Sequence, residues 1–184
     1  ALHDGRLYVP LSALEVTAAA DPGYACCTFR GGVAVYDALT GEKLWTAYSI
    51  DEPAREVGKN SVGTPRIAPS GAPVWNTPAL DPERGVMYVG TGTNYSSPAN
   101  DTSDAILALD MKDGRIRWHQ QMTEGDAWNM GCETEDRINC PPEDGPDFDF
   151  GAAVIIARDA NGKDVRIAAP QSVDVYALDP DDRA

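Results

Sequence analysis

The chain has 184 residues, with 29 acidic and 15 basic side chains and a formal net charge of −14 at pH 7. This charge argues against nucleic acid as a partner, because such binding depends on Lys and Arg that neutralise phosphates, and no run approaches the roughly 20 apolar residues of a membrane-spanning helix. With 17 Gly, 14 Pro and 42% hydrophobic residues, the composition predicts one β-rich domain over residues 1–184 with many turns.

The first expected strand follows a charged turn with Gly, in DGRLYVP over residues 4–10, and the strand-like run continues to Glu15. The same arrangement returns in ERGVMYVGTG over residues 83–92. Helical periodicity is weak along the whole chain, so we expect little or no helix.

The clearest pattern is a phrase that occurs twice. VAVYDALTGEKLW ends at Trp45 and AILALDMKDGRIRW ends at Trp118, and in both an Asp precedes the Trp by eight residues. The apolar run before each Asp predicts a strand, the Asp and the following Gly predict a turn, and the Trp lies in the next strand. The sequence therefore predicts the same β-hairpin at two places.

A third copy begins at VDVYALDP, with Asp179 in the place of Asp37 and Asp110. The three Asp residues are separated by about 70 residues, a spacing that fits four-stranded propeller blades with long loops. We expect these loops over residues 51–74, 93–104 and 123–149. The sequence predicts an all-β fold, a partial β-propeller of about three blades. Because three blades do not close a ring, we expect a fragment of a longer protein; an intact small β domain is the alternative.

Four motifs carry a family resemblance: CCTFRGGVAVYDALTGEKLW, GTGTNYSSP, TEGDAWNMGC and GPDFDFGA, in this order. They resemble the pyrroloquinoline-quinone (PQQ) alcohol dehydrogenases, and in particular the polyvinyl-alcohol-dehydrogenase-like branch, over nearly all of the chain. The resemblance implies an eight-bladed propeller in a Gram-negative periplasm, with the export signal outside these residues. It also implies PQQ and Ca²⁺ on the propeller axis, oxidation of small or polymeric alcohols, and cytochrome c as the electron acceptor.

Asp126, in TEGDAWN, is the candidate catalytic residue. An acid in a Gly-containing loop after a blade strand can be partly desolvated at a propeller mouth and can accept a proton from an alcohol. By resemblance, Asp126 is the base that takes the hydroxyl proton while hydride passes to the quinone. The alternative is an ordinary exposed acid, and Asn129 stands where relatives often carry a second Asp.

The resemblance also implies a calcium site, which needs hard oxygen ligands. Its candidates are Glu15, Asn94 and Asp126, although a gapless match would place the amide ligand at Thr93. The ion would act as a Lewis acid on the quinone carbonyl. For Glu15 the alternative is an acid on the rim of the propeller.

Three further residues are candidates for contact with PQQ. Trp75 corresponds to the tryptophan on which the quinone stacks, and a flat apolar ring suits a conjugated tricycle; a core Trp is the alternative. Arg30 matches a cation that would bind a PQQ carboxylate, with a surface Arg as the alternative. Gln171 stands where relatives often have Lys or Arg, which removes one expected charge.

The four cysteines complete the candidates. In the exported context that the resemblance implies, they favour two disulfides, Cys26–Cys27 and Cys132–Cys140. Related quinoproteins press a pair of adjacent, disulfide-bonded Cys against the cofactor, so Cys26 and Cys27 are cofactor candidates. A zinc site is the alternative, although no C-x₂-C pair is present.

PQQ-dependent alcohol oxidation is thus the function that the sequence predicts. A non-catalytic propeller of the outer-membrane assembly type, which binds protein partners, is the alternative from another class. It predicts no cofactor binding and no need for Asp126, Glu15 or Trp75.

Overall fold

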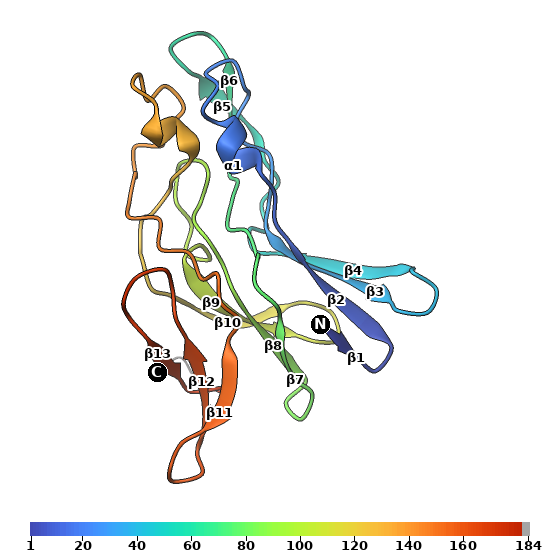
Figure 1. The fold of residues 1–184 in the computed structure, drawn as a ribbon. Coiled ribbons are helices and arrows are strands. Elements are labelled where there is room, and N and C mark those ends of the chain that lie inside the picture. The colour runs from blue at the N-terminus through green and yellow to red at the C-terminus, as the bar shows by residue number, and fades with distance from the viewer. Residues whose placement is uncertain (182–184) are drawn as a thin grey trace.

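The computed structural model describes residues 1–181 as a set of antiparallel sheets joined by long loops (Figure 1). The first sheet has four strands in sequence order: β1 (Leu2–His3), β2 (Arg6–Leu11), β3 (Gly32–Asp37) and β4 (Lys43–Tyr48). The second sheet also has four strands in sequence order: β7 (Ala79–Asp81), β8 (Val86–Gly90), β9 (Ala105–Asp110) and β10 (Ile116–Gln121). The third sheet has three: β11 (Ile155–Arg158), β12 (Asp164–Ala168) and β13 (Tyr176–Leu178).

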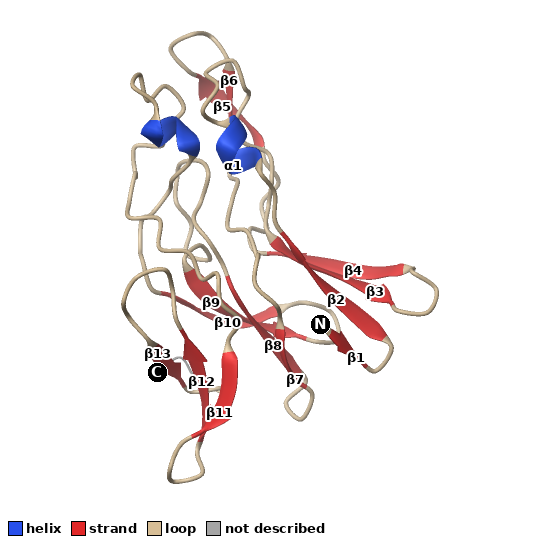
Figure 2. Ribbon diagram, in the orientation of Figure 1, coloured by secondary structure: helices blue, strands red, loops and turns tan. Residues whose placement is uncertain are grey.

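Helix is confined to two single turns in the described part of the chain, α1 (Glu15–Ala18) and the 3₁₀ turn η1 (Met130–Glu133) (Figure 2). This confirms the expectation of little or no helix. None of the helices described has the length and apolar character that crossing a membrane requires.

Segment 51–74 departs from its predicted loop. It forms the hairpin of β5 (Arg55–Lys59) and β6 (Pro65–Ala68). Every residue of β5 is exposed, so the segment shows no alternation of apolar and polar residues from which a strand could be predicted.

The two predicted hairpins are confirmed, and their turns share one geometry. Asp37 Oδ1 accepts a hydrogen bond from the backbone N–H of Leu39 at 3.0 Å, and Asp110 Oδ1 accepts the equivalent bond from Lys112 at 2.8 Å. The Gly of each turn has a positive φ, 75° at Gly41 and 78° at Gly114, a conformation that Gly adopts without the steric cost of a side chain. The repeated Asp and Gly therefore build the turn itself.

Each repeated Trp packs on the corresponding turn of the next repeat. A Cβ on Gly114 would lie 2.6 Å from the Trp45 ring, so this ring rests directly on the Gly backbone. Trp118 donates from Nε1 to the Pro180 carbonyl at 3.2 Å and packs against Tyr88. The Trp residues thus join successive sheets, as the blades of a propeller require.

The second sheet lies between the other two in the core. Residues alternate along β8 and β9, so each strand sends side chains to both faces. Met87 and Leu107 pack with Val33 and Val35 of the first sheet. On the other face, apolar side chains pack toward the third sheet: Tyr88, Ile106, Phe150 and Leu178. The fold is thus a stack of three blade-like sheets, the predicted all-β partial propeller.

Candidate functional site

The candidate site lies at one end of the sheets, where loops leave β2, β8 and β10. Isolated backbone bridges join Arg30 to Gly71, Gly71 to Asn94, and Asn94 to Ala127. Four segments that are far apart in the sequence therefore run side by side at this end. They place Asn94 next to Asp126, as the sequence predicts.

Asp126 is buried beneath the segment of residues 143–147 and is only 1% exposed. Its Oδ2 accepts the backbone N–H of Asp147 at 2.9 Å, while its Oδ1 has no hydrogen-bond partner. Burial raises the pKa of Asp126 above the ordinary aspartate value, and the backbone N–H groups of Asp147 and Gly145 oppose part of that rise. The result is a desolvated carboxyl with one free oxygen, which is suited to accept a proton.

Asn94 is fully buried beside Asp126. Its Nδ2 donates to Ser103 Oγ at 2.6 Å and to the Asp126 carbonyl at 3.3 Å. Its Oδ1 has no partner, and a buried oxygen without a partner is costly. The amide is therefore oriented with its oxygen available to a ligand.

Glu15 is placed differently from the two residues with free oxygens. It begins α1, and its carboxylate accepts hydrogen bonds from the backbone N–H groups of Thr28 and Phe29, at 2.6–2.9 Å, and from the Tyr24 hydroxyl at 2.9 Å. Glu15 therefore anchors the segment that carries Cys26 and Cys27. Its role as a metal ligand stays a prediction, and it would require exchange of some of these bonds.

Two further aspartates, Asp149 and Asp104, belong to the same region and were not predicted. Asp149 Oδ1 accepts the Thr93 N–H at 2.8 Å, and Oδ2 accepts Trp75 Nε1 at 2.9 Å. Asp104 has no exposed surface, and burial together with the charges of Asp126 and Asp149 raises its pKa to about 9. Burial likewise raises the pKa of Asp147 to about 7. The GPDFDF motif was the available signal for Asp147 and Asp149.

Trp75 presents part of its ring to solvent, with 44% of the residue exposed. A Cβ on Gly151 would lie 2.2 Å from the ring, so the Gly backbone supports the indole, and the bond to Asp149 fixes its orientation. A rigid, partly exposed indole is able to stack on a planar molecule.

Arg30 and Gln171 have other surroundings. Arg30 Nη1 donates to the carbonyls of Ile50 and Asp51, and its guanidinium lies 4.0 Å from the centre of the Tyr48 ring. Gln171 is exposed, and its backbone N–H donates to the Asp149 carbonyl at 2.9 Å. The guanidinium of Arg30 is therefore bound by the loop that follows β4. Gln171 is bound through its backbone to the segment that carries Asp149. Their contact with PQQ stays a prediction.

Both predicted disulfides are present, Cys26–Cys27 and Cys132–Cys140. Cys132, Cys140 and Asp144 also lie close enough together for a metal, but the sulfurs of the two Cys are bonded to each other, so the zinc alternative is not supported.

Asn129 caps η1 through its Oδ1 and donates to the Tyr95 and Asn139 carbonyls. It therefore stabilises the loop after Asp126.

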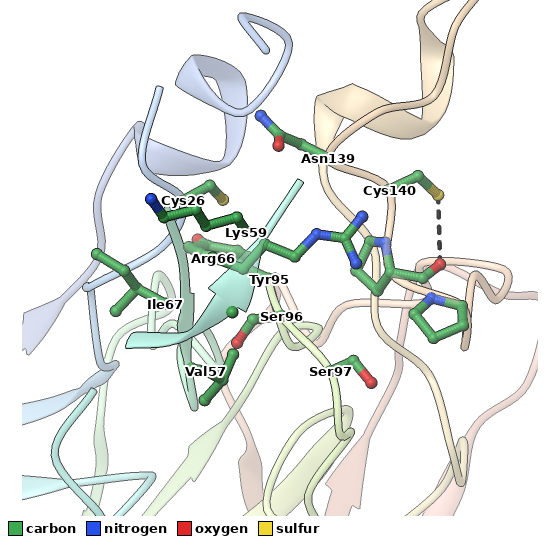
Figure 3. A pocket seen from close by; sticks show the side chains of 14 residues that line it. Cys26, Val57, Lys59, Arg66, Ile67, Tyr95, Ser96, Ser97, Asn139 and Cys140 are labelled. Atoms are coloured by element: carbon green, nitrogen blue, oxygen red, sulfur yellow. Dashed lines mark hydrogen bonds between the residues drawn. The ribbon is translucent and has the colours of Figure 1, made fainter. Parts of the chain in front are cut away.

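Cys26 also lines a pocket of about 290 Å³ between the β5–β6 hairpin and the loop that ends at Cys140 (Figure 3). Lys59 and Arg66 extend from the hairpin into this region, and Arg66 Nη2 donates to the Ile138 carbonyl at 3.0 Å. Neither Asp126 nor Trp75 is among the residues that line it. The pocket is therefore separate from the group of buried aspartates.

Comparison with known proteins gives relatives along nearly the whole chain. A polyvinylalcohol dehydrogenase of Sphingopyxis sp. (strain 113P3) is 38% identical over 179 residues, covering 96% of this chain and 27% of that protein. A polyvinylalcohol dehydrogenase of Pseudomonas sp is 35% identical over 179 residues, covering 97% of this chain and 28% of that protein. The chain thus spans less than a third of the length of these relatives.

The crystal structure of quinohemoprotein alcohol dehydrogenase from Comamonas testosteroni has the same fold in part of its chain. It aligns with a TM-score of 0.65 and 24% identity, covering 99% of this chain and 26% of that chain. The sequence model of the PQQ family, described as glucose/ethanol/alcohol dehydrogenase, beta-propeller domain, matches residues 14–142. The chain therefore belongs to the PQQ β-propeller family of glucose, ethanol and alcohol dehydrogenases.

Proposed function

We propose that the protein containing this chain oxidises alcohols with PQQ and Ca²⁺ bound at the end of the sheets that carries Asn94, Trp75 and Asp126. The observation that carries the proposal is that Asn94 lies in hydrogen-bond contact with the Asp126 backbone and that each of these residues has a buried side-chain oxygen without a partner. The polyvinylalcohol dehydrogenases among the relatives support polyvinyl alcohol, or other secondary or primary alcohols, as substrates.

The residues present fit both groups. Oxygen donors of the amide and carboxylate type are those that Ca²⁺ prefers, and Asn94 and Asp126 offer them, with Glu15 as a further carboxylate at the same end. The Trp75 ring, supported by Gly151, offers a stacking surface for the quinone. When bound, PQQ supplies the hydride acceptor, and Ca²⁺ supplies a Lewis acid that polarises the quinone carbonyl.

Asp126 performs the proton transfer in this proposal. Its free Oδ1 accepts the proton of the substrate hydroxyl, while Asp147 N–H holds the other oxygen in place. The burial that raises the pKa of Asp126 makes its carboxylate a stronger base than an exposed one. Asn94 holds the backbone carbonyl of Asp126 through Nδ2, which fixes the position of the base relative to the cation.

The electron acceptor and the location belong to the same proposal. We place the protein in a Gram-negative periplasm with cytochrome c as the acceptor of single electrons. Two disulfides support an oxidising compartment of this kind.

The test is Asp126→Asn in the complete protein. Asn keeps the shape but cannot accept the proton, so we expect kcat to fall by about 10²–10⁴-fold while PQQ stays bound. The matched control is Asp113→Asn, at an exposed residue of the turn between β9 and β10. It should leave kcat unchanged. Undiminished turnover in Asp126→Asn would remove Asp126 from the mechanism.

A further inference from the structure

Asp104 is a buried carboxylate for which neither the predicted mechanism nor the packing gives a role. It has no exposed surface, and neither Oδ1 nor Oδ2 has a hydrogen-bond partner. Charged groups are almost never fully buried unless they are paired or bind a metal. Such a carboxyl keeps its proton at neutral pH unless a cation binds beside it.

The charges that act on Asp104 are negative. After burial itself, Asp126, Asp149 and Asp147 are the charged groups that raise the pKa of its carboxyl. Asp126 and Asp149 are in turn close enough to influence each other. Two loops therefore bring these carboxyl groups close together, one between β8 and β9 and one between β10 and β11. A bound cation would relieve the repulsion between their charges.

The backbone fixes Asp104 beside the proposed cation ligands. Its N–H donates to the Gly92 carbonyl at 3.2 Å, and its carbonyl accepts the N–H of Met122 at 2.9 Å. Its neighbour Ser103 accepts the hydrogen bond of Asn94 Nδ2 at 2.6 Å. Asp104 is thus tied on one side to the segment that leads to Asn94 and on the other to the segment that leads to Asp126.

Two neighbouring loops, the loop between β8 and β9 and the loop after β10, therefore supply three buried side chains that each have an unpartnered oxygen: Asn94, Asp104 and Asp126. We propose that Asp104 belongs to the cation centre of Asn94 and Asp126 and supplies negative charge that strengthens binding of a hard cation. This inference rests on the proposed function for the presence of the cation, and it adds a residue that the motifs did not indicate.

The charge of Asp104 has a predictable effect on affinity. Coulomb attraction scales with the product of the charges, so loss of one carboxylate weakens a trivalent ion more than a divalent ion of similar size. Calcium and terbium ions both prefer oxygen donors, and terbium emission sensitised by a nearby Trp reports its binding. Trp75, which is bonded to Asp149, is placed to sensitise it.

The test measures Ca²⁺ and Tb³⁺ affinity of the complete protein after treatment with a chelator. The variant is Asp104→Asn, because Asn is isosteric and tolerates the left-handed backbone at this position (φ 48°). We expect Ca²⁺ affinity to fall by about tenfold and Tb³⁺ affinity to fall further. Asp101→Asn removes the same charge from a 75% exposed side chain of the same loop and should change either affinity less than about twofold.

Native affinity for both ions in Asp104→Asn would overturn the assignment, and so would an equal loss in Asp101→Asn. If Asp104→Asn does not fold, Asp104→Ser is measured in the same way against the same control. The proposed function is tested separately by PQQ binding. Loss of cation affinity in a protein that binds no PQQ would support Asp104 and contradict the quinoprotein function, whereas PQQ binding with unchanged cation affinity would contradict Asp104 alone.

Discussion

Gly145 determines how closely the segment of residues 143–147 approaches Asp126. A Cβ at Gly145 would lie 2.5 Å from Asp126 Oδ1, which is the oxygen without a partner. The carboxyl is therefore desolvated by backbone and not by a bulky side chain. This close contact contributes to the burial of Asp126.

Gly145→Ala should therefore impair the proposed base without disturbing the fold. The added methyl group must displace either the segment or the carboxylate, and we expect kcat to fall by about tenfold or more, since small misplacements of catalytic groups are costly. Steady-state kinetics of the two proteins measures the effect. Gly23→Ala, where the Cβ would meet only a flexible Asp21 side chain at 3.2 Å, is the matched control, and an equal loss in both variants would contradict this account.

Asp104 and Asp147 also predict how stability depends on pH in the cation-free protein. Their pKa values are raised to about 9 and about 7 by burial, so between pH 4 and these values the folded state binds protons that the unfolded state has released. The free energy of unfolding should then fall as pH rises through this window. Thermal unfolding at pH 5 and pH 8 with a chelator present should show a lower Tm at pH 8, and Asp104→Asn should reduce the difference. A Tm that rises over the same interval would contradict the raised pKa values.

The sequence indicated part of the site at the level of residues. Asp126, Asn94 and Trp75 lie in local motifs, and the structure brings the first two into contact. Asp104 could not be found in this way, because its importance arises from burial by segments distant in the sequence. The contacts of Arg30 could not be predicted from the local sequence either. Tyr48 and the carbonyls that accept hydrogen bonds from Arg30 lie about 20 residues later in the chain.

At the scale of elements, the repeated phrase is predictable because each of its residues acts locally. Asp and Gly form the turn, and the Trp lies at a fixed position in the following strand. What the phrase alone could not show is the target of the Trp, which is the turn of the next repeat. The β5–β6 hairpin was missed because its first strand is exposed on both faces.

Trp45→Ala tests the junction between the first two sheets. The variant removes the ring that packs on Gly114 and leaves Tyr8, its aromatic neighbour at 6.4 Å, without this contact. We expect the free energy of unfolding to fall by about 2–4 kcal/mol. This loss is smaller than that expected for a fully buried Trp, because the Trp45 side chain is only half-buried. Denaturant unfolding measures the loss. The smaller change Trp45→Phe should cost less, and equal stability of Trp45→Ala and the native chain would contradict the docking role.

At the scale of the whole molecule, a buried ion pair joins the second and third sheets. Arg166 on β12 is fully buried, pairs with Asp81 at the end of β7 and lies 4.8 Å from the centre of the Tyr88 ring. The two partners are 85 residues apart, so no local pattern could have predicted the contact. Apolar side chains on the facing sides of the sheets drive their packing. The Arg166–Asp81 pair adds a specific contact between the second and third sheets.

Arg166→Met should destabilise the stack strongly, because it leaves the Asp81 carboxylate buried without this partner. We expect a loss of about 3 kcal/mol or more in the free energy of unfolding. The matched control is Arg158→Met, whose ion pair with Asp164 lies on an exposed side chain and should contribute at most about 1 kcal/mol. Denaturant unfolding of both variants gives the comparison, and similar small losses would contradict a structural role for the buried pair.

A cofactor site at the loop end of the sheets, around Asn94, Trp75 and Asp126, is what the proposed function requires. The most direct measurement is equilibrium dialysis of PQQ against the complete protein, with Ca²⁺ and with a chelator. We predict saturable binding that requires Ca²⁺ and is lost in Asn94→Ala and weakened in Trp75→Ala. Absence of PQQ binding by the native protein in the presence of Ca²⁺ would contradict the account and favour a non-catalytic propeller that binds protein partners.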